Sequence, residues 1–344
     1  MSGPRGYSSY RGRKSKVKIL LAVVLILVIL AAVGFLILQK YVVYDESGTP
    51  HFLLPDQSAA ESSVGTGASS SSGDHLQITI DSPKNTDTRA VQLTDLPLTD
   101  WTSAQAALAG SNANAAVVTL KDESGSVYYD SAAALGAGAI KADGGTAAAI
   151  AEMTGSDTYT IARIACFLDP LSAKADVEGM GLKNTGGYIF YDGNNQNWLD
   201  PGKPAARQYL VSLAKECAAL GFDEILLTDV SYPTEGKLEK IDYGTGLKNE
   251  NISAFLTEMR TALRDSGAKL SVELPAAVIT SGSDTAAGLY LNELAPLTDR
   301  IYAAAEAADV SALTAAVRAE NPDADFVPEL AGTAPESGSC LLMP

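Results

Sequence analysis

Eight short apolar segments with the character of β-strands recur from residue 89 onward, and helix-like segments separate most of them. The strand candidates are residues 89–93, 114–121, 159–167, 222–230, 269–274, 299–303, 325–330 and 339–343. The helix candidates are residues 102–109, 146–154, 205–220, 251–265, 289–297 and 311–320. This alternation predicts a parallel α/β sheet, and eight units favour a closed (β/α)8 TIM barrel. The alternative is an open doubly wound sheet, but no glycine-rich phosphate loop follows the first strand.

The fourth strand candidate, residues 222–230, carries an acidic residue at its C-terminal end. The preceding helix candidate stops at Gly221, a residue that readily adopts positive φ at a helix C-terminus. The strand is apolar on both faces, as buried parallel strands are, and it ends in Asp229. Barrel enzymes place catalytic carboxylates at this end of a strand. The alternative is that Asp229 caps the next element or closes a turn.

Residues 19–38 form an uncharged stretch of twenty residues rich in Leu, Val and Ile. A helix of this length spans the hydrocarbon core of a membrane, about 30 Å. Basic residues cluster in the preceding segment, 1–18, which predicts a cytoplasmic N-terminus and an extracytoplasmic C-terminal domain. A cleaved signal peptide is the alternative. It would have a shorter apolar core ending in small residues, whereas residues 35–38 continue the run.

The chain is therefore expected to be a single-pass protein of the cell membrane with a tethered domain. Residues 39–56 form a juxtamembrane segment whose two apolar runs, around a Ser-Gly-Thr-Pro turn, predict a small hairpin. Residues 57–74 are mostly Ser, Gly and Ala, the composition of a flexible linker. Residues 75–344 form the barrel domain.

The charge distribution argues against nucleic acid as a partner. The chain has 25 basic and 41 acidic residues, and seven of the basic ones lie in residues 1–40, where there is no acidic residue. The remaining residues therefore carry 18 basic and 41 acidic side chains, a net charge of −23. Such a body repels phosphate backbones.

The cysteines and histidines do not form a catalytic or metal-binding pattern. Cys166, Cys217 and Cys340 lack metal-ligand spacing and are interpreted as inert buried thiols. His51 and His75 both precede the first strand candidate at residue 89, which excludes a histidine-based triad or a His-rich metal site in the barrel. We expect no cofactor and no metal.

Several segments occur in an order and spacing that are familiar from one family. They are residues 116–125, 159–164, 167–170, 198–201, 221–233 and 270–273. In these segments the chain resembles, as a divergent member, a bacterial family of membrane-anchored, glycoside-hydrolase-like TIM-barrel domains. The resemblance covers about residues 89–344 and is best over the first four strands. It implies a (β/α)8 barrel related to carbohydrate-active enzymes.

The chain departs from the family pattern at functionally important positions. The family usually has Asp at the positions of Thr119 and Thr228, and Arg at that of Ser231. The family's sixth-strand pattern is usually rich in Pro, Tyr and His, whereas residues 301–306 of this chain read Ile-Tyr-Ala-Ala-Ala-Glu. Because side chains alternate along a strand, Asp229 replaces the family acid at Thr228 only if the strand has already ended there.

Glycoside hydrolysis generally requires two carboxyl groups, one to protonate the leaving oxygen and one to act as nucleophile or to activate water. The catalytic candidates are Asp229, Glu273 and Glu329, which end the fourth, fifth and seventh strands. Glu273 is the strongest, since it follows an apolar run and occupies the family's acidic position. Its alternative role is a buried ion pair with Arg163, and that of Glu329 is to cap the following element.

Five further residues are candidates for substrate binding. Arg163 lies inside a strand, so it must be paired or hydrogen-bonded, and it would orient a carboxylate or bind a sugar acid. Lys121 and Asp122 end the second strand, with a solvated turn as the alternative. Trp198 lies in the longest connection and would stack on a sugar ring, or else fasten that connection to the barrel. Tyr232 follows the fourth strand.

Two functions are compatible with this pattern. The first is an extracytoplasmic glycoside hydrolase that acts on a cell-envelope or other polysaccharide by carboxylate acid/base chemistry. The second is a catalytically degenerate barrel that serves as a carbohydrate-binding or scaffolding module. Convergence of two carboxylates at the mouth of the barrel would favour the first, and carboxylates locked in ion pairs would favour the second.

Overall fold

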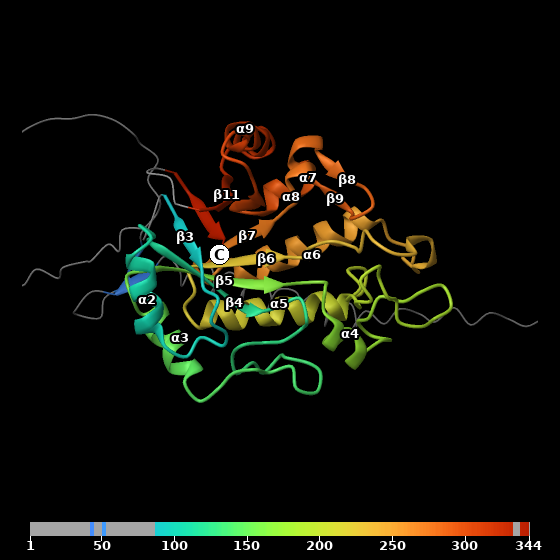
Figure 1. The fold of residues 1–344 in the computed structure, drawn as a ribbon, viewed down its shortest axis with the longest axis horizontal. Coiled ribbons are helices and arrows are strands. Elements are labelled where there is room, and N and C mark those ends of the chain that lie inside the picture. The colour runs from blue at the N-terminus through green and yellow to red at the C-terminus, as the bar shows by residue number, and fades with distance from the viewer. Residues whose placement is uncertain (1–41, 45–49, 53–86, 333–337, 344) are drawn as a thin grey trace, which may run out of the picture. The chain divides into compact units, whose positions relative to one another are not determined.

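The computed structural model describes residues 42–44, 50–52, 87–332 and 338–343. Eight parallel strands close into a barrel in the order β10-β11-β12-β3-β4-β5-β6-β7 (Figure 1). The strands are β3 (Arg89–Gln92), β4 (Ala115–Lys121), β5 (Tyr159–Ala165), β6 (Glu224–Thr228), β7 (Lys269–Glu273), β10 (Arg300–Ala304), β11 (Asp325–Ala331) and β12 (Cys340–Met343). All eight predicted strands are present, which confirms the (β/α)8 fold and excludes the open sheet.

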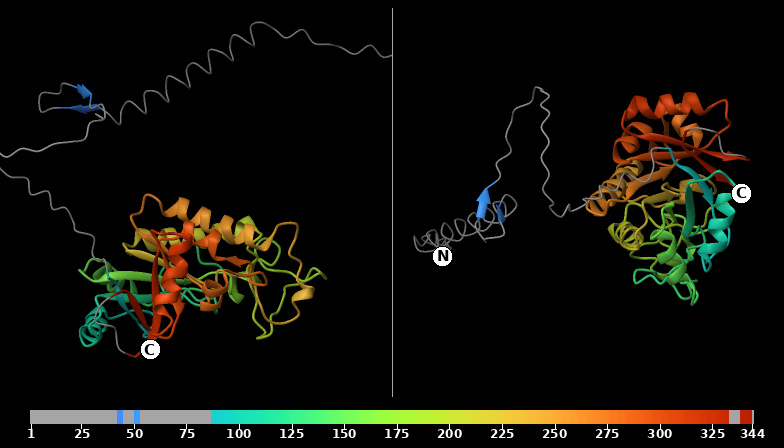
Figure 2. Two further views of the ribbon diagram at one scale, coloured as in Figure 1. Left: turned by 90° about the horizontal axis from the view of Figure 1, so that it is seen from above. Right: turned by 90° about the vertical axis from the view of Figure 1, so that its left-hand side faces the viewer.

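Helices surround this barrel, and the views in Figure 2 show them outside the strands. They are α2 (Trp101–Ala109), α3 (Thr146–Thr154), α4 (Pro170–Ala175), α5 (Pro204–Ala219), α6 (Lys248–Leu263), α7 (Ala276–Ser281), α8 (Leu291–Leu294) and α9 (Val310–Glu320), with 3-10 turns η1 (Leu238–Lys240) and η2 (Ala295–Leu297). Buried apolar side chains fill the layer between helices and strands.

One predicted helix is wrong in part, and two helices, α4 and α7, were not predicted. Residues 289–297 are not a single helix but β9 (Leu289–Tyr290), α8 and η2, because β9 pairs antiparallel with β8 (Ser283–Asp284) before the helix begins. Of the unpredicted helices, α4 begins at Pro170, and α7 starts directly after Pro275 and is followed by Gly282 with φ +83°. Each has six residues, which are too few to produce a helical hydrophobic repeat in the sequence.

The N-terminal unit is described only at its hairpin. β1 (Val42–Tyr44) pairs antiparallel with β2 (Pro50–Phe52), which confirms the predicted hairpin. The apolar stretch 19–38 and the linker 57–74 lie outside the described residues. Among the residues that the structure does describe, no helix is both long and apolar enough to cross a membrane.

The lower part of the barrel interior is filled by a polar cluster around Glu224. Its buried carboxylate accepts hydrogen bonds from Arg300 Nη1 at 2.8 Å, Tyr302 Oη at 2.8 Å and Tyr159 Oη at 2.9 Å. These bonds offset part of the cost of burying both charges, although Arg300 Nε and Nη2 have no hydrogen-bond partner among the described residues. Because this interior is packed, a ligand reaches the barrel only from the mouth, at the C-terminal ends of the strands.

Candidate functional site

The strand alternation determines which side chains face the mouth. Ala90, Val117, Ile161 and Leu226 form one buried cluster inside the barrel. The residues two positions later therefore face inward one layer higher, toward the mouth. This upper layer consists of Gln92, Thr119, Arg163, Thr228, Glu273 and Glu329.

Arg163 is at the centre of this layer. Its Nη2 donates to Glu273 Oε2 at 3.3 Å, and its Nη1 donates to Glu123 Oε1 at 3.0 Å. Burial alone would lower the pKa of Arg163, but Glu273 and Glu123 raise it above its ordinary value. The predicted pairing of Arg163 with Glu273 is therefore present. It is only half-buried, since 31% of the Glu273 side chain is exposed.

Asp229 turns toward the same group of charges. β6 ends at Thr228, and Asp229 has φ +52°, so the strand alternation no longer applies to it. Its carboxylate accepts a hydrogen bond from Thr228 Oγ1 at 3.1 Å. Burial first, and then the charge of Glu123, raise the pKa of Asp229 to about 6. The condition under which Asp229 could stand in for an acid at position 228 is thus met.

Glu329 completes the set of carboxyl groups. Only 8% of the residue is exposed, and no described residue forms a hydrogen bond or ion pair with its carboxyl group. Burial, and next the charge of Glu273, raise the pKa of Glu329 to about 7. Because the charges of Glu273 and Arg163 act on both Asp229 and Glu329, the structure brings all three predicted acids together around Arg163.

Glu123 also belongs to this site, although sequence reasoning did not select it. It lies in the loop after β4, two residues beyond Lys121, and 43% of its side chain is exposed. The available signal was its position directly after the C-terminal end of a barrel strand, where such folds carry functional residues. Thr119, which has no acidic group, instead accepts a hydrogen bond from Gln92 Nε2 at 3.0 Å.

Lys121 and Asp122 do not join the mouth. Lys121 is buried, with its Nζ 3.1 Å from Asp169 and 2.7 Å from the carbonyl oxygen of Ala165. Asp122 closes the turn after β4, where it accepts hydrogen bonds from the backbone of Ser124 and Ser126 at 3.0 Å. Both side chains are therefore engaged in local structure, which agrees with the turn alternative for Asp122.

Trp198 and Tyr232 are also packed into the protein. Only 8% of Trp198 is exposed, and its Nε1 donates to Asp192 at 2.8 Å, so it fastens the long connection. Tyr232 is fully buried, and its hydroxyl accepts a hydrogen bond from Asn251 Nδ2 at 2.8 Å. The structure thus leaves Arg163 as the one predicted binding residue among the described residues that lies at the mouth.

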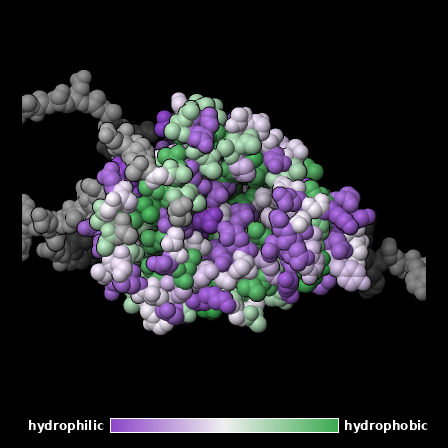
Figure 3. All heavy atoms as spheres, viewed as in Figure 1, coloured by the Kyte–Doolittle hydropathy of each residue, from purple (hydrophilic) through white to green (hydrophobic). Residues whose placement is uncertain are grey.

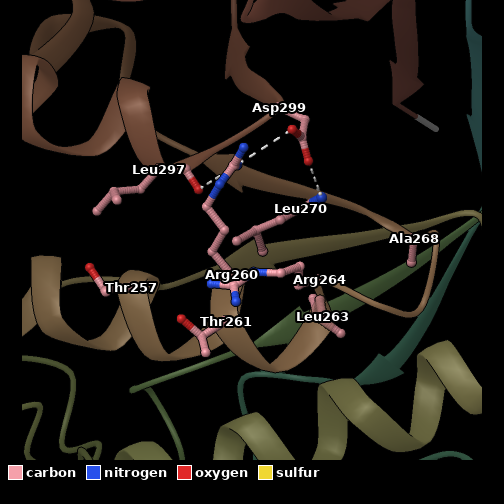
Figure 4. A pocket seen from close by; sticks show the side chains of 9 residues that line it. All are labelled: Thr257, Arg260, Thr261, Leu263, Arg264, Ala268, Leu270, Leu297 and Asp299. Carbon is pink, nitrogen blue, oxygen red and sulfur yellow. Dashed lines mark hydrogen bonds and ion pairs between the residues drawn. The ribbon is translucent and has the colours of Figure 1, made fainter. Parts of the chain in front are cut away.

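Two hollows adjoin the mouth, and a third lies at the other end of the barrel. A pocket of about 630 Å³ includes Gln92, and one of about 610 Å³ includes Glu329. Hydrophilic residues occupy much of the middle of the face in Figure 3. The third, of about 470 Å³, is shown in Figure 4, where Arg260 reaches from α6 to Leu297 and Asp299. It lies near the N-terminal ends of β7 and β10, away from the carboxylates.

The described residues contain no group of three or more His, Cys, Asp and Glu residues arranged to hold a metal ion. The three cysteines are free and buried, and burial raises the pKa of Cys166 and Cys217. Carboxyl groups and one guanidinium lie at the mouth. The pKa values of Asp229 and Glu329 are raised toward neutral pH, and Glu273 is paired with a cation.

One family model and several solved structures are similar to this chain. The model of a family described as "Putative glycosyl hydrolase domain" matches residues 101–305. A hypothetical protein from Ruminiclostridium thermocellum ATCC 27405 is 27% identical, with 53% of this chain and 96% of that one covered and a TM-score of 0.46. The PgaB (BpsB) glycoside hydrolase domain from Bordetella bronchiseptica is 13% identical, with 75% and 94% covered and a TM-score of 0.51, which shows a shared fold. No curated protein matches the chain.

Proposed function

The chain belongs to the family described as "Putative glycosyl hydrolase domain", and we propose that it is a glycoside hydrolase acting on a cell-envelope or other polysaccharide at the barrel mouth. The observation that carries this proposal is the convergence of Asp229, Glu273 and Glu329 around Arg163. Acids of unlike protonation state in one site are what acid/base hydrolysis of a glycoside requires.

We assign the proton-donating role to Asp229 and the opposing role to Glu273. A pKa of about 6 leaves Asp229 protonated often enough near neutral pH to transfer a proton to the glycosidic oxygen. Glu273 lies on the neighbouring strand β7, and its ion pair with Arg163 fixes its orientation. Its carboxylate would attack the anomeric carbon or activate a water molecule. Glu329 is the third acid, and the negative charge of Glu273 contributes to its raised pKa.

A non-catalytic carbohydrate-binding or scaffolding barrel is the second candidate, and specific observations favour it. The family acids are replaced at Thr119 and Thr228, and both residues are buried at the mouth. Glu273 and Glu123 are both paired with Arg163, so each carboxylate is partly neutralised. In this function the mouth would bind a glycan without cleaving it.

One experiment separates these two functions. The full chain, in detergent, is incubated with purified wall and capsule polysaccharides, and new reducing ends and binding are scored together. Cleavage by the wild type that is lost in Asp229→Asn and Glu273→Gln supports the hydrolase. Binding without cleavage, unaffected by these changes, supports the binding module.

We also propose that the chain is held in the cell membrane by residues 19–38, with residues 1–18 in the cytoplasm and the barrel outside. The support is in the sequence: a stretch of twenty uncharged apolar residues follows a basic segment. An extracytoplasmic barrel would be in direct reach of envelope polysaccharides.

A further inference from the structure

The turn after β4 carries Glu123 to Arg163. Asp122 closes this turn through the backbone N–H groups of Ser124 and Ser126. Because 43% of the Glu123 side chain is exposed, its ion pair with Arg163 is only as well aligned as the turn beneath it. The alignment of Glu123 therefore depends on what fixes this turn to the barrel.

Asp169 fixes the turn at both of its ends. Its Oδ2 lies 3.1 Å from Nζ of Lys121, two residues before Glu123. Gly125, two residues after Glu123, lies so close that a Cβ there would overlap Asp169 Oδ1, and its φ of +87° also favours glycine. Asp169 is fully buried and is held as the N-cap of α4, where Oδ1 accepts a hydrogen bond from Ser172 N at 2.8 Å. Glu123 thus stands midway between two contacts with one rigid carboxylate.

The ion pair of Lys121 and Asp169 is better suited to fixing geometry than to stabilising the fold. The two side chains are 1% and 0% exposed, and the cost of burying two charges offsets much of their attraction. Packed apolar side chains of similar volume would stabilise the barrel as well or better. The pair adds a fixed arrangement, since Lys121 Nζ also donates to the carbonyl oxygen of Ala165 at 2.7 Å. It ties the ends of β4 and β5 to the start of α4.

The position of Glu123 matters because its charge acts on Asp229. The ionisable groups around Asp229 are Glu123 of the β4 loop, Arg163 of β5, Cys166 just beyond β5, and Glu273 of β7. Burial is the first cause of the raised pKa of Asp229, and the charge of Glu123 is the next. If the Glu123 carboxylate moved away, Asp229 would lose its proton at a lower pH.

We propose that Asp169 is a positioning residue of the barrel mouth, which holds the turn of residues 121–125 at both ends and so places the Glu123 carboxylate against Arg163. This placement belongs to the chain whether or not it cleaves a glycan. Its consequence for catalysis, that Glu123 helps to keep the proton donor Asp229 protonated, rests on the proposed function. Asp169 acts only through Glu123, since it is itself fully buried.

The test compares two glycines of the connection between β4 and β5, in the full chain in detergent. Gly125→Ala puts a methyl group against Asp169 and should displace the turn without changing any charge. Gly138→Ala is the matched control, because Gly138 also has a positive φ, +72°, but has open space where a Cβ would lie. The readout is the titration midpoint of Asp229, followed by the carboxyl-carbon NMR signals of aspartate-labelled protein and assigned with Asp229→Asn. This readout needs no substrate.

We expect the midpoint of Asp229 to fall by about half a pH unit in Gly125→Ala, a roughly threefold change in its acid dissociation constant. It should stay at about 6 in Gly138→Ala. Glu123→Gln should lower it at least as much as Gly125→Ala, since it removes the charge itself. The double variant should match Glu123→Gln alone, because Gly125 acts through Glu123. On a glycan that is cleaved, the alkaline decline of kcat/KM should move with the midpoint.

Three results would each overturn the positioning role: an unchanged midpoint in Gly125→Ala, an equal fall in Gly138→Ala, or a further fall in the double variant. If Gly125→Ala does not fold, Asp169→Asn is measured alone and together with Glu123→Gln. Asn still caps α4, and the direct effect of the lost charge is the same in both backgrounds, so an equal fall in both would also overturn the role. Shifted midpoints in a chain that cleaves no glycan would keep the role and refute the hydrolase.

Discussion

Arg163 on β5 reaches across β6 to Glu273 on β7, with 3.3 Å between Nη2 and Oε2. The same guanidinium holds Glu123 of the β4 loop at 3.0 Å. One cation therefore spans four consecutive strands of the barrel and fixes two carboxylates at its mouth. Since the ion pair with Glu273 is partly exposed, its contribution to stability is small, and its main effect is to orient Glu273.

Glu273→Gln should impair function much more than folding. The change keeps the shape of the side chain but removes its charge, so turnover should fall by at least about a hundredfold. Arg163 keeps Glu123 as a partner, so the free energy of unfolding should change by less than about 1 kcal/mol. Turnover and melting temperature are measured together, with Glu123→Gln as the matched control for the ion pair. A large loss of stability, or undiminished turnover, would show that Glu273 is structural.

Asp229 predicts how activity depends on pH. A general acid must be protonated, and Asp229 with a pKa of about 6 loses its proton as the pH rises through that value. kcat/KM should therefore decline on the alkaline side from about pH 6. Asp229→Asn keeps the left-handed backbone, which Asn tolerates well, but should reduce turnover by about a hundredfold or more. If the residual kcat/KM of this variant still declines above about pH 6, the decline belongs to another group.

Glu329 predicts a change in stability with pH. Its pKa is raised from 4.5 to about 7 in the folded protein, so the fold binds a proton that the unfolded chain has released. The stability that Glu329 contributes is therefore present below about pH 4.5 and is lost as the pH rises through about 7. Glu329→Gln should flatten this dependence, so the variant should gain stability relative to wild type between pH 5 and pH 8. Melting temperatures of the variant and the wild type at pH 5 and at pH 8 measure this gain. Glu320→Gln, which removes an exposed acid at the end of α9, should show no such gain.

The barrel could be predicted because each of its strands is recognisable from a short stretch of sequence. Each of the eight strands is a short apolar run, and the family motifs lie along the first four of them. The same local signal identified Arg163, since a cation inside an apolar strand requires a partner. It did not identify Arg300, whose partner Glu224 lies 76 residues away and becomes visible only when the barrel closes.

The functional site could be predicted only in part, because it depends on where each strand ends and on which partners the side chains find. Asp229 faces the mouth because β6 ends one residue before it and its φ is positive, and strand ends are the least predictable part of an element. Trp198 is predicted to stack on a sugar and Tyr232 to bind substrate, but the polar atoms of both have partners within the protein. An aromatic residue with a polar atom suits either role, so its environment has to be seen.

Membrane topology is predicted from the sequence and is tested directly. Protease added to intact protoplasts should remove the barrel and leave a small fragment that contains residues 19–38. The physical reason is that the basic segment 1–18 is retained in the cytoplasm. A chain in which residues 5, 11, 13, 14, 16 and 18 are changed to Gln is the control, and its orientation should become mixed. Full protection of the barrel in the wild type would refute this orientation.

The polar cluster inside the barrel predicts the most destabilising single change. Arg300 and Glu224 are both fully buried, and Glu224 also accepts hydrogen bonds from Tyr159 and Tyr302. Glu224→Gln leaves the Arg300 cation with only the more distant Asp325, 3.9 Å from its Nε, as a charge partner, which should cost about 3–5 kcal/mol of unfolding free energy. Urea unfolding measures the loss. Replacing Arg300 and Glu224 together, by Met and Gln, should recover part of it, because no uncompensated charge then remains. Glu273→Gln is the comparison, since its side chain is partly exposed. If Glu224→Gln lowers the free energy of unfolding by no more than Glu273→Gln does, water must reach this part of the barrel.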